Sequence, residues 1–534
     1  MLDGLATRML GLAPPMCDYT VSRNVGIPTR DGVELLADVY APAIDSRGTI
    51  LVRSPYGWSL PMAVLNGAVY ANRGYHVVLA RCRGTFGSGG TFEPMVHEVD
   101  DGADTVAWLR GQPFFTGRFA TCGMSYLGFT QWALLMDPPP ELATAVISVG
   151  PHDFHEAAYQ GGAFNLNDFL GWSNMVGHQE DGLVRVLVQQ ARAERDLART
   201  VSELPLASAG DRLLDGRAPW YRDWVTTRDP NAPMWAPMKL RAALDRVRVP
   251  VLLQTGWQDL FLSQTLEQYA HLRERGVDVA LTVGPWTHLG AAMKGNRILV
   301  PETLDWFDEH LAESGIHKRA APVKVFVTGA AQQWRDLPVW PPPTDERVLF
   351  LGPAGALEDE PAKVGSQVDL AYDPADPTPT IGGRLLARNG GYTDDTDLGA
   401  RRDVATFVGS TLTAPLEVVG CPVIELAHTS DNPHADLFAR LSEVNAAGKS
   451  QNVSEGFVRL DIDAGTSVRV VLDAIAHRFA AGNGIRLVIA GGSHPRWERN
   501  LGTGEDPATS SRLVPSRRTI ELSSSRLLLP IARP

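Results

Sequence analysis

A serine stands at the centre of the segment of this chain that is best suited to chemistry. Ser125 lies in CGMSYLG, residues 122–128, between a strand-like run over 118–122 and a helix-like run over 129–136. A serine hydroxyl is a poor nucleophile unless a sharp strand-to-helix turn projects it toward a base and toward backbone N–H groups. The strict G-x-S-x-G pattern would place glycine at 127, whereas this chain has Leu127 and then Gly128. The segment predicts a nucleophilic serine, with an ordinary structural turn as the alternative.

An acid and a histidine follow this serine, each at the end of a strand-like run. Asp259 comes after the apolar run 250–254, and His288 comes after the apolar run 279–283. Short apolar runs of this kind are typical of buried parallel strands. Serine, acid and histidine in this order are characteristic of α/β-hydrolases, whose open sheets bind ligands beyond the carboxyl ends of their strands. We therefore expect the three residues to meet at one site.

Two alternatives stay open for these assignments. Asp259 could instead cap the helix-like segment 263–275 at its N-terminus. Other histidines compete for the role of base, but only His288 follows the strand after the acid, as the base of such a triad should. The competing histidines are His97, His152, His155, His271 and His310.

The composition limits the partners of this chain. It has 534 residues, so two or three domains are expected, and its 44% hydrophobic and 21% charged content is ordinary for globular proteins. A net charge of −12 argues against nucleic-acid and anionic membrane partners, which need clustered Lys and Arg. Four scattered cysteines indicate no disulfide framework, the first residues do not resemble a secretory signal, and no apolar run could span a bilayer. We expect a cytoplasmic location.

No cofactor or metal is expected. The sequence contains no H-E-x-x-H, no paired C-x-x-C and no G-x-x-x-x-G-K-[ST]. The glycine-rich run 84–90 lacks the lysine of a phosphate-binding loop, and we interpret it as a loop rich in turns. The residues do not indicate an oligomeric state.

The alternation of elements predicts an α/β fold with a doubly wound sheet. Strand-like and helix-like runs alternate over 1–150 and again over 241–318, which together form the expected, discontinuous catalytic domain. Residues 151–240 are helix-like and should form an inserted cap over the site. Residues 319–534 show short β-type runs punctuated by turn residues, which predicts a C-terminal β-sandwich.

Six segments of the chain together form a recognisable set of motifs. They are RSPY at 53–56, RGTFGSGG at 83–90, GMSYLG at 123–128, GWQD at 256–259, GPWTH at 284–288 and RWERNLGTGE at 496–505. This set resembles one family, the cocaine esterase and X-prolyl dipeptidyl aminopeptidase (CocE/NonD) hydrolases. In this family serine, tyrosine and one further residue precede the glycine, so the resemblance accounts for Leu127 and Gly128. It also names the C-terminal sandwich as a jelly roll.

The resemblance implies two donors for an oxyanion hole. Tyr56 would contribute its phenolic O–H, and Tyr126 its backbone N–H. A tetrahedral intermediate of acyl transfer needs such donors aimed at its developing negative charge. The residues alone would favour a different interpretation, in which Tyr56 packs in a turn after Pro55.

The substrate is less clearly indicated. Phe261, Trp172 and Phe169 are candidates for a substrate pocket, although aromatic residues more often serve as packing residues. A peptidase that removes dipeptides must hold a substrate ammonium with a buried carboxylate. The acids available for this in the insertion are Asp153, Glu156, Asp168 and Glu180.

A serine hydrolase of small-molecule esters, amides or short peptides is therefore expected, with ester hydrolysis preferred. An Xaa-Pro dipeptidyl-peptidase, an amino-acid ester hydrolase and an acyltransferase that uses the same acyl-enzyme are the alternatives. A non-catalytic β-sandwich scaffold would leave Ser125, Asp259 and His288 without a joint role.

Overall fold

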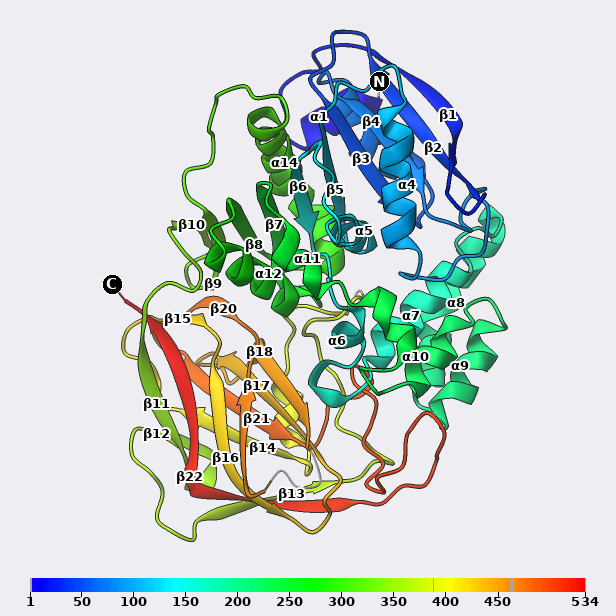
Figure 1. Ribbon diagram of the computed structural model, residues 1–534. Coiled ribbons are helices and arrows are strands. Elements are labelled where there is room, and N and C mark those ends of the chain that lie inside the picture. Colours follow the sequence, from blue (N-terminus) through cyan, green and yellow to red (C-terminus); the bar gives the residue numbers. More distant parts are fainter. Residues whose placement is uncertain (1, 388, 461–464, 534) are drawn as a thin grey trace.

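A computed structural model of the protein describes residues 2–387, 389–460 and 465–533. An N-terminal sheet flanked by helices, a helical insertion and a strand-rich C-terminal part are visible in Figure 1. No helix in these ranges is long and apolar enough to cross a membrane.

The N-terminal sheet is mostly parallel. Its strands are β1 (Tyr19–Pro28), β2 (Glu34–Pro42), β3 (Thr49–Ser54), β4 (His76–Arg81), β5 (Phe119–Met124), β6 (Leu142–Ser148), β7 (Val251–Gln258), β8 (Val279–Thr287), β9 (Val323–Gly329) and β10 (Gln333–Leu337). They pair in the order β1, β2, β4, β3, β5, β6, β7, β8, β9, β10, and the pairs from β4 to β9 are parallel. Every residue of β3 and β7 is buried, as expected for strands covered on both faces. The predicted doubly wound α/β fold is confirmed.

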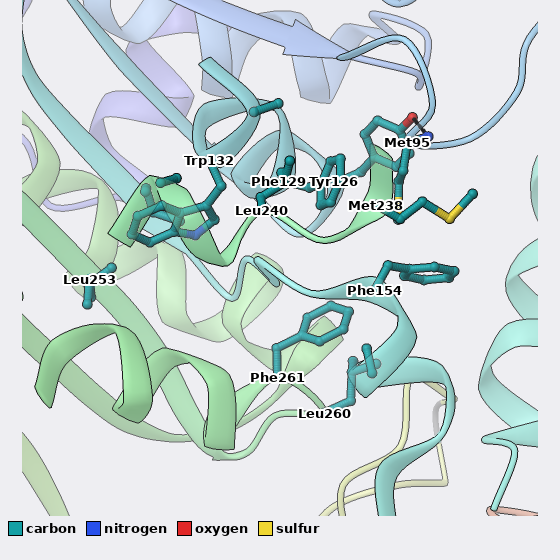
Figure 2. Close-up of a cluster of buried hydrophobic side chains, with 14 of the residues drawn as sticks. Met95, Tyr126, Phe129, Trp132, Phe154, Met238, Leu240, Leu253, Leu260 and Phe261 are labelled. Carbon is teal, nitrogen blue, oxygen red and sulfur yellow. Dashed lines mark hydrogen bonds between the residues drawn. The ribbon is translucent and has the colours of Figure 1, made fainter. Parts of the chain in front are cut away.

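Helices flank this sheet. They are α1 (Leu2–Met9), α2 (Leu60–Ala63), α3 (Val69–Ala71), α4 (Glu98–Arg110), α5 (Tyr126–Leu134), α12 (Leu262–Glu274), α13 (His288–Gly290) and α14 (Asn296–His310), with the π-helical turns η1 (Val64–Ala68) and η4 (Ala291–Gly295). Tyr126, Phe129 and Trp132 extend from α5 into a large apolar core that also holds Phe154 and Leu253 (Figure 2).

The chain between β6 and β7 is helical. Its elements are α6 (Phe154–Ala158), η2 (Gln160–Gly162), α7 (Leu166–Gly177), α8 (Leu183–Val201), α9 (Leu206–Leu214), α10 (Trp220–Thr226), η3 (Pro233–Met238) and α11 (Arg241–Arg246). Aromatic rings from α6, α7 and α10 form its centre: the ring centroid of Phe154 lies 4.9 Å from that of Phe169 and 4.5 Å from that of Trp224.

The C-terminal part is a β-sandwich with its own core of leucine, isoleucine and valine. Its elements are β11 (Thr344–Gly352), η5 (Pro353–Gly355), β12 (Ala356–Glu358), β13 (Gln367–Tyr372), η6 (Thr396–Ala400), β14 (Val404–Gly409), β15 (Leu416–Gly420), β16 (Val423–Ser430), β17 (Asp436–Val444), β18 (Ser450–Arg459), β19 (Ser467–Val471), β20 (Ile475–Phe479), β21 (Gly484–Ala490) and β22 (Ser516–Ala532). The long strand β22 pairs with β11, β13, β15 and β16. The predicted strand-rich C-terminal part is confirmed.

Two strands after position 319 pair with the first sheet. Strand β9 is parallel to β8, with Leu281 opposite Val323, and β10 pairs with β9. Both strands therefore extend the first sheet. A short parallel pairing of β9 with β20, with His477 opposite Thr328, joins this sheet to the sandwich.

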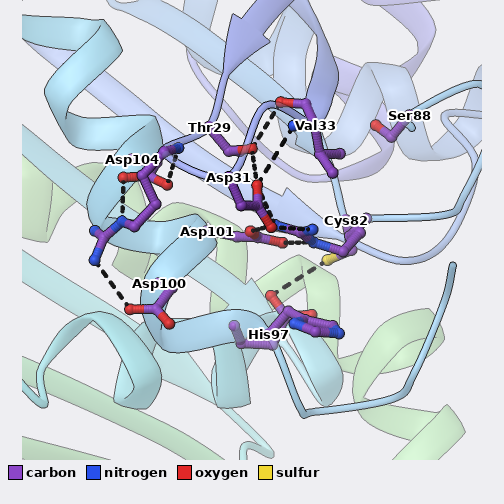
Figure 3. Close-up of polar contacts among 12 residues, drawn as sticks. Thr29, Asp31, Val33, Cys82, Ser88, His97, Asp100, Asp101 and Asp104 are labelled. Atoms are coloured by element: carbon purple, nitrogen blue, oxygen red, sulfur yellow. Dashed lines mark hydrogen bonds and ion pairs between the residues drawn. The ribbon is translucent and has the colours of Figure 1, made fainter. Parts of the chain in front are cut away.

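The glycine-rich loop 83–90 is held by ion pairs. The guanidinium of Arg83 contacts Asp101 on α4 at 2.6 Å and Asp31 at 2.7 Å; both carboxylates are visible in Figure 3. Gly84 has a φ of +68°, and a Cβ there would lie 2.1 Å from the backbone nitrogen of Phe92. The glycine therefore permits a close backbone approach in this loop.

Candidate active site

Ser125 occupies a strained turn between β5 and α5. Its φ is +62° and its ψ −121°, a conformation that residues with a side chain rarely adopt. Its backbone N–H donates to the carbonyl of Ser148 at 2.9 Å, and its own carbonyl accepts from Gly128 at 2.8 Å. These bonds fix the strained backbone, so the turn holds Ser125 at the carboxyl end of β5.

The glycines around Ser125 explain the unusual spacing of the motif. A Cβ on Gly128 would lie 2.6 Å from the Cα of Gly150, and one on Gly150 would lie 2.8 Å from the Cα of Gly128. The start of α5 thus packs directly against the backbone that follows β6. Glycine is therefore required at position 128, whereas the Leu127 side chain is buried in an apolar core.

Asp259 and His288 form a buried pair after β7 and β8. The Nδ1 atom of His288 lies 2.6 Å from Oδ1 of Asp259. His288 is 6% exposed and Asp259 is 0% exposed. The Oδ2 atom of Asp259 accepts from the Thr255 hydroxyl at 3.0 Å and from the Phe261 backbone N–H at 3.1 Å. The carboxylate is thus fully engaged, and its Oδ1 orients the imidazole ring.

The alternative role of Asp259, as the N-cap of a helix, accounts for only part of its contacts. The helix α12 begins at Leu262, and the residue before it, Phe261, makes no side-chain capping bond. The Oδ2 atom of Asp259 accepts from the Phe261 N–H at the start of this helix, while its Oδ1 atom contacts His288.

The competing histidines have partners elsewhere. His155 contacts the Arg228 carbonyl at 2.9 Å, and His152 is buried with Nδ1 3.2 Å from the Gln268 amide nitrogen. The others pair with neighbours as follows: His97 with Glu93, His271 with Asp245, and His310 with the Trp306 ring.

Tyr56 follows β3 and lines the same cavity as the nucleophile. Its hydroxyl oxygen accepts from Nε1 of Trp172 at 3.0 Å. Burial raises the pKa of Tyr56 to about 12, so the phenol stays protonated at neutral pH. Because the indole occupies one lone pair of the oxygen, the phenolic hydrogen is available to a group beside Ser125.

Tyr126 begins α5, and its backbone N–H belongs to the first turn, where no carbonyl of the same helix can accept it. Its side chain is buried and structural: the hydroxyl donates to Glu98 at 2.8 Å and accepts from the Met95 N–H at 2.7 Å. Glu98 in turn forms an ion pair with Arg53 at 2.6 Å. This network anchors the N-terminus of α5, and the sequence did not predict it.

A cavity of about 1370 Å³ opens in front of the nucleophile. Ser125, His288, Tyr56 and Trp172 all line it, together with residues of η1, α7, α8, η4 and α14. The segment 386–387 of the strand-rich part also contributes to the wall.

The two other predicted pocket aromatics lie elsewhere. The ring of Phe169 packs inside the helical insertion against Phe154, and Phe261 contacts His288 edge-on, with centroids 5.4 Å apart. Neither belongs to the cavity wall. Phe169 therefore supports the insertion, and Phe261 supports the imidazole.

The described residues contain no group of three or more His, Cys, Asp or Glu side chains arranged to hold a metal ion. Of the acids proposed from the sequence as amine anchors, Asp168 lines the cavity, whereas Glu180 accepts from the Phe86 N–H at 3.0 Å and Asp153 accepts from the Glu156 N–H at 3.0 Å.

The mostly parallel sheet, the serine in a strained strand-to-helix turn and the buried acid–histidine pair define a serine hydrolase of the α/β-hydrolase class. Residues 31–290 match the X-Pro dipeptidyl-peptidase (S15 family), and residues 314–526 match the X-Pro dipeptidyl-peptidase C-terminal non-catalytic domain. The chain is 31% identical to the cocaine esterase of Rhodococcus sp. (strain MB1 Bresler), over 91% of this chain and 93% of that protein. It belongs to this family, the CocE/NonD serine hydrolases.

Solved structures share the fold over nearly the whole chain. An alpha-amino acid ester hydrolase superposes with a TM-score of 0.81 at 20% identity, covering 98% of both chains. An aminopeptidase from the marine sediment archaeon Thaumarchaeota archaeon gives 0.82 at 20% identity, again covering 98% of both.

Proposed function

We propose that this serine hydrolase cleaves carboxylic esters through an acyl-enzyme on Ser125. The observation that carries the proposal is the 2.6 Å contact of Asp259 with His288, which lines the same cavity as Ser125. Buried pairs of this kind orient an imidazole so that its other nitrogen can act as a base.

In the proposed mechanism, Asp259 accepts the Nδ1 hydrogen of His288, which leaves the unprotonated Nε2 as the base. His288 takes the Ser125 proton as the serine oxygen attacks the acyl carbon. The protonated imidazole then gives this proton to the departing alcohol, and water releases the acid by the same steps. Asp259 stabilises the imidazolium in both halves of the reaction.

Tyr56 and the Tyr126 backbone N–H would form the oxyanion hole. Tyr56 lines the same cavity as Ser125, and its phenol stays protonated up to about pH 12, so it can donate to the oxygen that becomes negative. The Tyr126 N–H lies at the N-terminus of α5, where the helix dipole also favours negative charge.

A second candidate activity is hydrolysis of X-Pro peptides or amino-acid esters. It is favoured by the match of residues 31–290 to the X-Pro dipeptidyl-peptidase (S15 family). Acyl transfer to an added amine or alcohol uses the same intermediate and is the third candidate.

All four cysteines are unpaired in the structure, which supports the proposed cytoplasmic location.

Labelling with a fluorophosphonate probe tests the nucleophile before a substrate is known. Peptide mapping should find the label on Ser125, and Ser125→Ala should abolish it. A matched control is Ser59→Ala, because Ser59 lines the same cavity but has no place in the mechanism. Label that persists in Ser125→Ala would contradict the proposal.

A substrate panel then separates the activities. We expect p-nitrophenyl esters to be cleaved faster than Xaa-Pro p-nitroanilides, and water to be the main acyl acceptor when hydroxylamine is added. Faster cleavage of the anilides would favour the peptidase, and hydroxamate as the main product would favour the transferase.

A further inference from the structure

The cavity in front of Ser125 continues along one face of the sheet. Cys122 of β5 and Val146 of β6 line it and lie opposite each other in the parallel pair of these strands. Both belong to the apolar core on the sheet face that α3 and α14 cover. Cys122 lies three residues before Ser125, so at about 3.3 Å per strand residue this part of the cavity reaches about 10 Å from the nucleophile.

We call this part of the cavity the shaft. Helix α14, which forms one of its walls, stands apart from helices α7 and α8 of the insertion (Figure 1), so the shaft and the wall formed by α7 and α8 are different parts of the cavity. The turn η1 on its other side is π-helical, and single π-helical turns within helices occur frequently at functional sites. The shaft is defined by six lining residues: Leu65 of η1, Tyr70 of α3, Cys122, Val146, and Leu299 and Val300 of α14.

The shaft is uncharged. Burial raises the pKa of the Cys122 thiol to about 12 and also raises the pKa of the Tyr70 phenol, so both groups stay protonated at neutral pH. The other four side chains are aliphatic. The acids and arginines that line the cavity lie elsewhere, in β1, β2, β4, α7 and α8.

The polar side chains beside the shaft already have partners. The Ser148 hydroxyl donates to Oε1 of Gln254 at 2.7 Å, and the Gln254 amide donates to the Leu299 carbonyl at 3.1 Å. The Thr303 hydroxyl donates to the same carbonyl at 2.8 Å. Because these donors are used within the protein, a polar ligand group would lose its hydration there without full compensation. An apolar group has no such cost, and an apolar space of this kind also holds water poorly.

We propose that the shaft binds an unbranched aliphatic chain of the ester substrate. A chain that starts at the carbonyl beside Ser125 would bury its methylene groups against the six lining residues, and each buried methylene favours binding. The inference rests on the proposed acyl-enzyme function and adds the class of substrate: esters with a chain as long as the shaft, hexyl to octyl. A packing void that takes no ligand is the structural alternative.

Two series of esters test the proposal on wild type. In the first, p-nitrophenyl esters vary in the acyl chain from acetyl to decanoyl; in the second, acetate esters vary in the alcohol chain from ethyl to decyl. We expect kcat/KM to rise about two- to fourfold with each added methylene in one series, and to stop rising near the length of the shaft. A rise in the first series assigns the shaft to the acyl chain, and a rise in the second assigns it to the alcohol chain. No rise in either series would overturn the proposal.

Substitutions of Val300 test whether the chain lies in the shaft. Val300→Phe should fill part of it, so activity on the octyl or octanoyl ester should fall roughly 10- to 100-fold relative to that on the shortest ester, the loss of several buried methylenes. Val300→Ala removes two methyl groups and should lengthen the preferred chain by about one or two methylenes. A gain on longer chains cannot result from misfolding, so this variant keeps the test independent of stability.

Met175→Phe is the matched control. Met175 of α7 lines the cavity outside the shaft and is 49% exposed, so its substitution should leave the preferred chain length unchanged. Equal losses on short and long esters in Val300→Phe, with an unchanged preference in Val300→Ala, would assign Val300 a packing role and overturn the proposal. The same shift in Met175→Phe as in Val300→Phe would also contradict it. Labelling of Ser125 and turnover of the shortest ester report separately on the proposed function.

Discussion

The hydroxyl oxygen of Tyr56 accepts from Trp172, so its hydrogen can donate into the cavity that Ser125 lines. Tyr56→Phe keeps the ring and removes the donor, so we expect kcat to fall by about 10²–10³, as when one oxyanion donor is removed elsewhere. Steady-state kinetics on a p-nitrophenyl ester would measure this. Fluorophosphonate labelling should persist, because Ser125, His288 and Asp259 remain.

The ionisation of Tyr56 gives a second test at the same scale. Burial raises its pKa to about 12, and only the protonated phenol donates. Ionisation of the phenol should therefore not reduce kcat until the pH approaches about 12.

A Trp172→Phe variant, which keeps an aromatic ring without the indole N–H, should lower kcat less than Tyr56→Phe. Unchanged kcat in Tyr56→Phe would remove this residue from the oxyanion hole.

At the scale of elements, α5 must approach the backbone after β6 for the nucleophile turn to form. A methyl group on Gly128 would lie 2.6 Å from Gly150, and backbone cannot move aside as a flexible side chain can. Gly128→Ala should destabilise the fold by about 1–3 kcal/mol, the usual cost of overpacking, and reduce kcat by displacing Ser125. Denaturant unfolding and esterase kinetics would measure the two effects.

Gly4→Ala is the matched control for this substitution. Gly4 lies in α1, and a Cβ there meets nothing within 4 Å. Alanine favours a helix over glycine, so stability should stay the same or rise slightly. Equal stability of Gly128→Ala and wild type would show that the close approach is not required.

At the scale of the whole molecule, Glu498 connects the helical insertion with the strand-rich part. Its side chain is fully buried and bonds Arg228, which precedes η3, at 2.6 Å and Arg459 of β18 at 2.6 Å. Glu498→Gln would remove these ion pairs, although Arg228 keeps Asp506 and Arg459 keeps Asp436 as a carboxylate partner. We expect a loss of about 1.5–3 kcal/mol, the usual contribution of a hydrogen bond to a charged group. Thermal unfolding would show this as a lower Tm.

The pH dependence of this stabilisation has a defined sign. Burial opposes ionisation of Glu498, but Arg228 and Arg459 hold its pKa below the ordinary value of 4.5. The stabilisation is therefore complete above pH 4.5 and is lost as the pH falls through the lower pKa of the folded state.

Glu505→Gln is the control for Glu498→Gln: Glu505 is an exposed partner of Arg512, so its loss should change Tm little. Equal Tm values for both variants would contradict the account.

The sequence predicted those features that depend on order along the chain. The succession of Ser125, Asp259 and His288 after strand-like runs identified three candidates: in the structure Ser125 and His288 line one cavity, and Asp259 contacts His288. Alternating periodicities indicated the α/β fold, which is confirmed. Contacts between distant segments were not predictable. Asp168 bonds Leu386, 218 residues away, and no local pattern marks such a partner. Phe169 shows the same limit, because periodicity identifies a buried helix face without telling a core from a cavity wall.

Trapping the acyl-enzyme tests the central claim most directly. Protein mixed with p-nitrophenyl acetate and quenched in acid within the first turnovers should gain the mass of one acetyl group, and peptide mapping should place it on Ser125. Ser125→Ala should gain none, and His288→Ala should acylate far more slowly. Turnover of the ester without any acylated protein, or acetyl on a residue other than Ser125, would contradict the mechanism proposed for this site.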